Sequence, residues 1–195
     1  MPGLERADSL VVNPHKWLFT PVDCSLLYVR DPALLKAAFS LVPEYLRTAE
    51  DSAVTNLMDY GFQLGRRFRS LKLWMVIRAF GVEGLRERIR EHCALARDLA
   101  AWIAADPRFE LAAPVPFSTV CFRARAEGED PDRFNERLLA RVNAAGPVFL
   151  SHTVLEGRHT LRVAIGNLRT EREHIERLWE LVGRAYEELR REEGA

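Results

Sequence analysis

From Phe109 onward, the sequence repeats one order of elements: strand, strand, helix, strand, strand, helix. Aspartate followed by proline at 130–131 is an N-cap with proline in the first helical position, so a helix is expected from there to about residue 145. Thr170 and Glu173 form the Thr-x-x-Glu pattern of a capping box and open the final helix. Short apolar runs predict the four strands at residues 109–112, 119–123, 148–151 and 160–165. This order predicts a self-contained small α/β or α+β domain.

Two longer helices are expected ahead of this domain. Apolar residues recur at helical spacing over residues 66–80, and Gly81 stops that helix. A second helix is predicted over residues 84–105, where an aspartate-proline pair ends it. We place a domain boundary between these helices, with one domain over residues 1–83 and a small C-terminal domain over residues 84–195.

The N-terminal region predicts strands and loops. Two apolar runs, residues 7–12 and 24–29, are expected to be strands, and the β-branched content of the first predicts a buried one. The segment between them contains two prolines and predicts a loop. A short helix is expected over residues 31–39 and a long surface loop over residues 42–61. Because a buried strand needs neighbours on both sides and few residues precede this one, we expect most of its sheet to lie outside this chain.

Composition bounds the function classes. Lysine plus arginine and aspartate plus glutamate number 28 each among 195 residues, so net charge gives no reason to expect nucleic acid or a membrane surface as partner. The three cysteines are scattered and predict neither a disulfide framework nor a metal site. No basic segment followed by an apolar run marks a signal peptide, and no apolar stretch approaches the roughly 20 residues of a spanning helix. We therefore expect a soluble, cytoplasmic protein without a metal.

Lys16 is the residue with the clearest chemical interest. It stands between His15 and Trp17 on a segment that leaves a predicted strand, which is where ligands bind in α/β sheets. Burial and cationic neighbours lower the pKa of a lysine and make it nucleophilic. The alternative is an ordinary lysine whose aliphatic stem lies along Trp17. On these residues alone, the ordinary lysine is the better interpretation.

The run Asn13-Pro14-His15-Lys16-Trp17 changes that balance. It resembles the Schiff-base lysine motif of the group II pyridoxal phosphate (PLP)-dependent amino-acid decarboxylases, a family of fold type I. The match is nearest to the aromatic-L-amino-acid decarboxylase branch and covers nearly the whole chain. It continues in order through residues 64–74, 106–109, 120–123 and 161–165. The resemblance implies an α/β fold, made of the end of the large PLP-binding domain's sheet over residues 1–83 and a complete small α+β domain.

The same resemblance implies cofactor-binding roles. Lys16 would hold pyridoxal 5'-phosphate as a Schiff base. His15 and Asn13 would lie near the cofactor phosphate, where a cation and amide donors suit an anion. Gly65 would let the backbone approach the phosphate, of the same or of the partner subunit. The alternatives are a structural histidine at His15 and a simple turn glycine at Gly65.

Two further residues bear on the reaction. Tyr45 resembles the tyrosine of the family's mobile catalytic loop, where it would protonate the substrate carbon after carbon dioxide leaves. A phenylalanine there would indicate aldehyde-forming chemistry, and an exposed loop tyrosine is the alternative. Arg162 would face the substrate carboxylate, for which its fork geometry is suited, and a structural ion pair is the alternative.

The function implied is decarboxylation of an L-amino acid, aromatic by branch resemblance, to an amine and carbon dioxide, by a homodimer. The family's aspartate on the pyridine nitrogen, its ring-stacking aromatic residue and much of its phosphate cup precede the lysine. We therefore expect this chain alone to have little or no decarboxylase activity. Two alternatives are a non-catalytic remnant acting as a dimerisation or binding module, and another PLP reaction such as aldehyde synthesis, transamination or carbon–carbon lyase chemistry.

Overall fold

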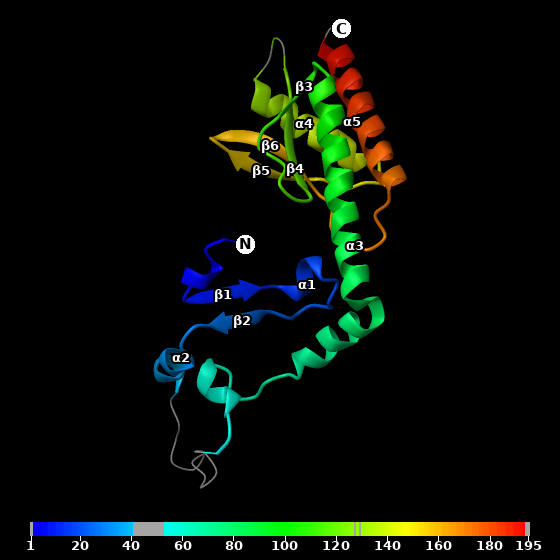
Figure 1. The fold of residues 1–195 in the computed structure, drawn as a ribbon. Helices are drawn as coiled ribbons and strands as arrows, with labels where there is room; N and C mark the ends of the chain where they lie inside the picture. Colours follow the sequence, from blue (N-terminus) through cyan, green and yellow to red (C-terminus); the bar gives the residue numbers. More distant parts are fainter. Residues whose placement is uncertain (1, 41–52, 127, 129, 194–195) are drawn as a thin grey trace. The chain divides into compact units, whose positions relative to one another are not determined.

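The computed structural model describes residues 2–40, 53–126, 128 and 130–193, and the chain divides into two compact units, Met1–Gly81 and Val82–Ala195 (Figure 1). Tyr45 and the first part of the predicted surface loop lie outside the described residues. No helix in the described ranges is long and apolar enough to cross a membrane.

The first unit contains a two-stranded antiparallel ribbon. Strand β1 (Ser9–Val12) pairs with β2 (Leu26–Val29), with Ser9 opposite Val29 and Val12 opposite Leu26. Both strands occur where the sequence predicts them. The prediction that the first is buried is wrong for this structure, because β2 is its one strand neighbour among the described residues. Val11 is 57% exposed and Tyr28 is 58% exposed.

A one-turn helix, α1 (Pro14–Trp17), follows β1, where the sequence analysis predicts a loop. The two prolines of that segment are the source of the error. Pro14 occupies the first helical turn, where its missing N–H needs no partner and its fixed φ favours the helix. The Thr20 N–H donates to the Pro14 carbonyl over 3.1 Å and closes the segment into a compact turn.

The remaining elements of this unit are short helices. A 3₁₀ turn, η1 (Leu4–Arg6), precedes β1, and another, η3 (Leu57–Tyr60), lies in the described part of the predicted loop. Helix α2 (Pro32–Phe39) confirms the predicted short helix. Its N-cap, Asp31, accepts a hydrogen bond from the Ala33 N–H over 2.9 Å.

Helix α3 (Arg69–Ala105) runs through both units and is interrupted at Gly81. Gly81 has φ 68° and ψ 167°, outside the helical region, and a positive φ of this size favours glycine. The two predicted helices and the break between them are therefore confirmed.

The second unit contains the predicted strand and helix order. After α3 come β3 (Phe109–Leu111), β4 (Thr119–Ala124), α4 (Pro131–Ala144), β5 (Ser151–Leu155), β6 (Arg158–Ala164) and α5 (Arg172–Glu193). The strands form an antiparallel sheet in the order β3-β4-β6-β5, and α4 packs against β4, β6 and α5 (Figure 1). The predicted helix after Asp130 is confirmed, since its carboxylate accepts from the Asp132 N–H.

Two local predictions in this unit are wrong. Strand β5 begins at Ser151 rather than at 148, because a tight Glu156-Gly157 turn, with positive φ at both residues, sets its register against β6. The capping box at Thr170 is displaced by one residue. The Glu171 N–H donates to Nδ1 of His174 over 3.0 Å, so the histidine acts as the acceptor expected of Glu173.

The core of the second unit is aromatic at its centre. The ring centroid of Phe109 lies 5.4 Å from that of Tyr186, and Phe134 lies 5.3 Å from Tyr186. The final helix, α5, packs one face into this core, where Ile175, Leu178, Val182, Tyr186 and Leu189 are buried.

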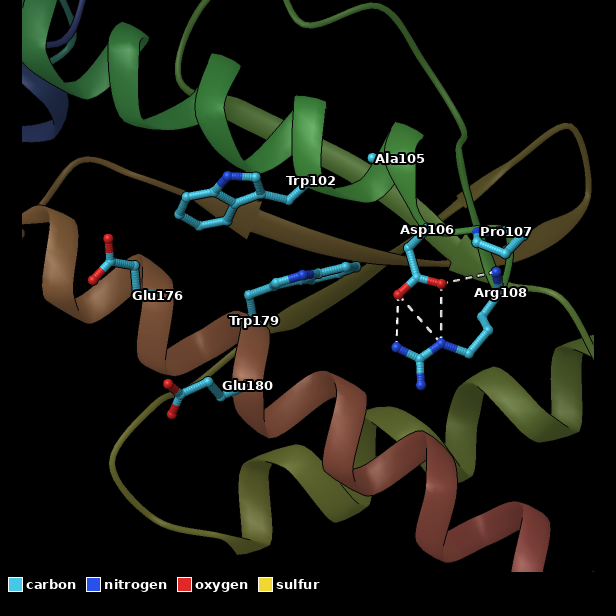
Figure 2. Close-up of a pocket in the computed structure, with 8 residues that line it drawn as sticks. All are labelled: Trp102, Ala105, Asp106, Pro107, Arg108, Glu176, Trp179 and Glu180. Carbon is cyan, nitrogen blue, oxygen red and sulfur yellow. Dashed lines mark hydrogen bonds and ion pairs between the residues drawn. The ribbon is translucent and has the colours of Figure 1, made fainter.

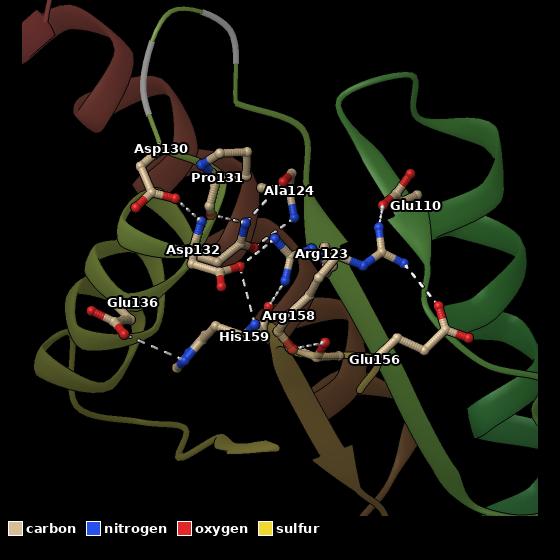
Figure 3. A network of polar contacts seen from close by, with 12 residues as sticks. Glu110, Arg123, Ala124, Asp130, Pro131, Asp132, Glu136, Glu156, Arg158 and His159 are labelled. Atoms are coloured by element: carbon tan, nitrogen blue, oxygen red, sulfur yellow. Dashed lines mark hydrogen bonds and ion pairs between the residues drawn. The ribbon is translucent and has the colours of Figure 1, made fainter. Parts of the chain in front are cut away.

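A polar network joins β4 to α4 and β6 (Figure 3). Arg123 is 3% exposed, its Nη2 lies 2.7 Å from Asp132 Oδ1, and its Nη1 donates to the His159 carbonyl. The guanidinium lowers the pKa of Asp132. The side-chain amide of Asn135 accepts from the Ala124 N–H over 2.8 Å and donates to the Ala124 carbonyl over 2.9 Å. These buried polar groups are therefore paired, as stability requires.

Candidate active site

The predicted lysine lies on α1, directly after β1. Its backbone N–H donates to the Asn13 carbonyl over 3.0 Å, which forms the turn that carries the side chain. The side chain of Lys16 is exposed. Within the described part of the chain, it has no ion pair, so its amine is available to a ligand carbonyl. A primary amine in this position has the chemistry that Schiff-base formation needs.

His15 is held by Cys24, which lies two residues before β2. Its Nδ1 lies 2.6 Å from the Cys24 carbonyl oxygen and 3.2 Å from the Cys24 backbone nitrogen. The backbone N–H of His15 donates to the same carbonyl over 3.3 Å. The ring is held at Nδ1, so Nε2 is the nitrogen that can face a ligand, and it donates only when the imidazole carries a proton there. Asn13 is fixed in a similar way, because Ser25 Oγ donates to its Oδ1 over 2.6 Å. Its amide NH₂ can then donate to an anion. The turn thus brings together three predicted site residues, Asn13, His15 and Lys16.

Asp23 and Arg69 were not identified from the sequence, yet they support this turn. Asp23 Oδ2 lies 3.1 Å from Arg69 Nε and 3.0 Å from its Nη2, so one carboxylate oxygen receives two nitrogens from the start of α3. The hydrogen bond with Arg69 lowers the pKa of Asp23 and raises that of Arg69. The adjacent Cys24 is buried, with its Sγ 3.9 Å from the Arg69 carbonyl. Their separation of 46 positions explains why spacing gave no signal.

Gly65 lies in an exposed segment before α3, in the same unit as Lys16. A Cβ built on it would meet nothing within 4 Å, so packing in this unit does not by itself require glycine. Its neighbour Arg66 donates to the Leu57 carbonyl over 3.3 Å. The approach of a phosphate to Gly65 stays a prediction.

Arg162 belongs to the second unit, on β6. Its Nη1 donates to Ser151 Oγ on the neighbouring β5 over 3.3 Å. On the other side of β6, Cys121 of β4 is the residue paired with Arg162. The described residues provide no ion pair to Arg162, so the structural ion pair considered from the sequence is not found among them. Its contact with a substrate carboxylate stays a prediction, as does the role of Tyr45.

Residues 1–125 match the family model described as the pyridoxal-dependent decarboxylase conserved domain. The chain belongs to this family. It is 43% identical over 198 residues to tryptophan decarboxylase 1 of Oryza sativa subsp. japonica, covering 97% of this chain and 38% of that protein. It is also 43% identical over 185 residues to phenylacetaldehyde synthase of Arabidopsis thaliana, covering 92% of this chain and 38% of that protein.

A solved structure agrees with these sequence matches. The crystal structure of Oryza sativa TDC with PLP and tryptamine has a TM-score of 0.91 and 43% identity, covering 96% of this chain and 40% of that one. The chain therefore spans about 38% of the length of the curated relatives named here. The resemblance stated from the lysine motif, to the C-terminal part of a fold type I decarboxylase, is confirmed.

The family's cofactor is pyridoxal phosphate. The residues of the α1 turn fit this group in three respects. Lys16 has an exposed amine for the aldehyde. Asn13 keeps its amide NH₂ as a donor for the phosphate after its contact with Ser25. His15, held by Cys24 at Nδ1, offers Nε2, which suits a phosphate when the imidazole is protonated.

Proposed function

We propose that this chain contributes the cofactor lysine and the small domain of a PLP-dependent carboxy-lyase, which converts an aromatic L-amino acid to its amine and carbon dioxide. The observation that carries the proposal is the α1 turn, in which an exposed Lys16 amine stands beside a fixed His15 and a fixed Asn13. The aromatic substrate is supported by the names of the relatives, which include tryptophan and tyrosine decarboxylases.

The residues of the chain take distinct parts in this reaction. When bound, PLP supplies an electron sink for the pair left by the departing carboxylate. Lys16 holds the cofactor through its amine, and His15 and Asn13 bind its phosphate together with the backbone at Gly65. Tyr45 donates a proton to the substrate carbon, and Arg162 orients the substrate through its carboxylate before that group leaves.

Each of the two units corresponds to a different domain of the proposed enzyme. The boundary proposed at residues 83–84 separates the end of the large PLP-binding domain from the small domain.

We further propose a cytoplasmic homodimer. Large apolar side chains exposed in the first unit support a covering subunit or domain, namely Tyr28, Phe62, Phe68, Trp74 and Met75. Light scattering at micromolar concentration tests this, and a stable monomer contradicts it.

The cofactor lysine is tested by trapping. The full chain is incubated with PLP and reduced with borohydride, and its peptides are analysed by mass spectrometry. Lys16 is expected to carry the pyridoxyl group, and Lys16→Ala to abolish that adduct. The other lysines, Lys36 and Lys72, are internal controls in the same sample. Equal modification of all three contradicts the proposal.

The reaction is tested by product analysis. The chain alone is expected to release little carbon dioxide from aromatic amino acids, since it spans 38% of a related enzyme. A longer protein, in which this chain follows the preceding part of a related decarboxylase, is expected to release carbon dioxide and amine. Strong turnover by the chain alone contradicts this expectation.

A second candidate reaction is oxidative aldehyde synthesis, in which dioxygen takes up two electrons and the nitrogen leaves as ammonia. The 43% identity to a phenylacetaldehyde synthase favours it. Tyr45 supports the amine product, because its phenol can return the proton that yields the amine. In the longer protein, Tyr45→Phe is expected to shift the product from amine toward aldehyde. Aldehyde as the main product before substitution supports the second candidate instead.

A further inference from the structure

The second unit contains a cavity of 740 Å³ that is wide open to solvent and that none of the predicted site residues lines. It lies where the end of α3, the turn before β3 and one side of α5 meet (Figure 2). A volume of this size falls within the range of roughly 300–1,000 Å³ typical of small-molecule sites.

The apolar walls of the cavity are two indole rings. Trp102 comes from α3 and Trp179 from α5, and both are half-buried with part of their surface in the cavity (Figure 2). The Trp179 ring centroid lies 5.0 Å from that of Phe109 and 6.4 Å from that of Phe122, so the core holds this ring in place. Flat indole faces suit a planar aromatic ligand, and their quadrupole attracts a cation.

The cation at the end of the cavity is already neutralised. Arg108 Nη2 lies 2.6 Å from Asp106 Oδ2, and Arg108 Nη1 lies 2.5 Å from Glu187 Oε1. These contacts raise the pKa of Arg108, and the hydrogen bond from Arg108 lowers the pKa of Asp106. A guanidinium held by two carboxylates offers little to an anionic ligand.

The cavity rim instead offers two carboxylates. Glu176 and Glu180 are exposed and stand one turn apart on α5. Their arginine partners lie outside the cavity lining: Arg172, which also binds Asp98, is 3.9 Å from Glu176, and Arg177 is 3.2 Å from Glu180. Exposed ion pairs of this kind are weak, so a ligand ammonium can compete for these carboxylates.

We propose that this cavity binds an arylalkylamine, with its aromatic ring against Trp102 and Trp179 and its ammonium at Glu176 and Glu180. The assignment follows from the cavity alone and does not require the decarboxylation proposed above. The product of that reaction belongs to the same chemical class, so the site would respond to accumulating product.

Calorimetric titration of the full chain without PLP tests the site. The probes are 2-phenylethylamine, its neutral analogue 2-phenylethanol and the anion 3-phenylpropionate. We expect the amine to bind at least about fivefold more tightly than the alcohol, and the anion more weakly than either. The double variant Glu176→Gln, Glu180→Gln is expected to weaken amine binding by about fivefold or more and to leave alcohol binding unchanged.

Two control variants locate the effect. Glu173→Gln removes the same charge from α5 outside the cavity lining and is expected to leave amine binding unchanged. Lys16→Ala is expected to leave it unchanged as well, which separates this site from the cofactor lysine. Trp102→Ala, checked for folding by circular dichroism, is expected to weaken both the amine and the alcohol.

Several results overturn the proposal. They are an absence of amine binding, equal affinity for amine and alcohol, an equal loss in Glu173→Gln, or loss of binding in Lys16→Ala. Failure of this site leaves the trapping of PLP on Lys16 unaffected, so the two proposals are distinguishable.

Discussion

Residues 1–81 and residues 82–195 are stabilised by different kinds of contact. Among the described residues of the first unit, those that are buried are Pro14, Thr20, Cys24 and Asp59. Polar contacts fix its lysine turn, including the pair between Asp23 and Arg69. The second unit has a continuous apolar core between Leu95 and Leu189. The turn that carries the cofactor lysine therefore lies in the unit with the smaller core, whose large apolar side chains are exposed.

The largest expected effect is in the apolar core. Phe122→Ala, at a side chain that is 1% exposed, is expected to lower the free energy of unfolding by about 3–5 kcal/mol through lost burial and a cavity. Phe68→Ala in the first unit, where the side chain is 75% exposed, is expected to change it by less than about 0.5 kcal/mol. Chemical denaturation measures both. Similar losses for the two variants would mean that the first unit is covered in solution.

A smaller effect is expected in the polar network of the second unit. Arg123→Met removes the buried guanidinium that pairs with Asp132 and the His159 carbonyl, while Asp132 keeps the His159 N–H as a donor. The substitution is expected to cost about 2–3 kcal/mol of unfolding free energy. Arg125→Met, at the exposed arginine that directly follows β4, is the matched control. A loss no greater than that of the control would mean that the network does not stabilise the fold.

The second unit is also expected to lose stability in acid. Burial lowers the pKa of His92 and of His159 below the usual 6.5. The unfolded chain therefore binds protons at a higher pH than the folded one. The contribution of the two histidines to the free energy of unfolding is fully present above about pH 6.5. It falls as the pH drops toward their pKa values in the folded chain, by at most about 1.4 kcal/mol per pH unit per histidine. Denaturation at several pH values measures the slope, which His159→Gln should make shallower. An unchanged slope would assign it to other groups.

The smallest effect is local to the lysine turn. Asp23→Asn keeps the size of the side chain but removes the charge that binds Arg69. Amide hydrogen exchange at His15 and Cys24 is expected to quicken, and trapping of PLP on Lys16 to slow, with little change in global unfolding. Asp31→Asn, at the N-cap of α2, is the control. Unaltered exchange and trapping would show that the turn holds without the ion pair.

The sequence predicted the second unit better than the first, and the reason is physical. Asp130 before a proline and Gly81 at a positive φ are local signals, read within a few residues. Proline in the sequence indicates a loop but also suits the first turn of a helix, so it does not by itself predict the helix at Pro14–Trp17. The register of β5 depends on the Glu156-Gly157 turn, whereas an apolar run indicates a strand without fixing its register.

The candidate site divides in the same way. Lys16, His15 and Asn13 were predicted because they are contiguous and form one motif. The contacts that hold them come from Cys24, Ser25 and, through Asp23, from Arg69. Folding brings these partners to the motif from other parts of the chain. They follow no regular spacing in the sequence, so the sequence alone does not predict them.

The amide of Asn135 has a consequence for which substitutions the second unit tolerates. It pairs with the backbone N–H and carbonyl of residue 124, groups that every residue except proline presents. Position 124 can therefore vary among small side chains without losing this contact. Position 135 has little such freedom, because aspartate lacks the donor, leucine lacks both groups, and glutamine is longer by a methylene. In a collection of random variants, substitutions by other small residues should survive at 124 and all substitutions should be eliminated at 135, although the same two hydrogen bonds join the two positions.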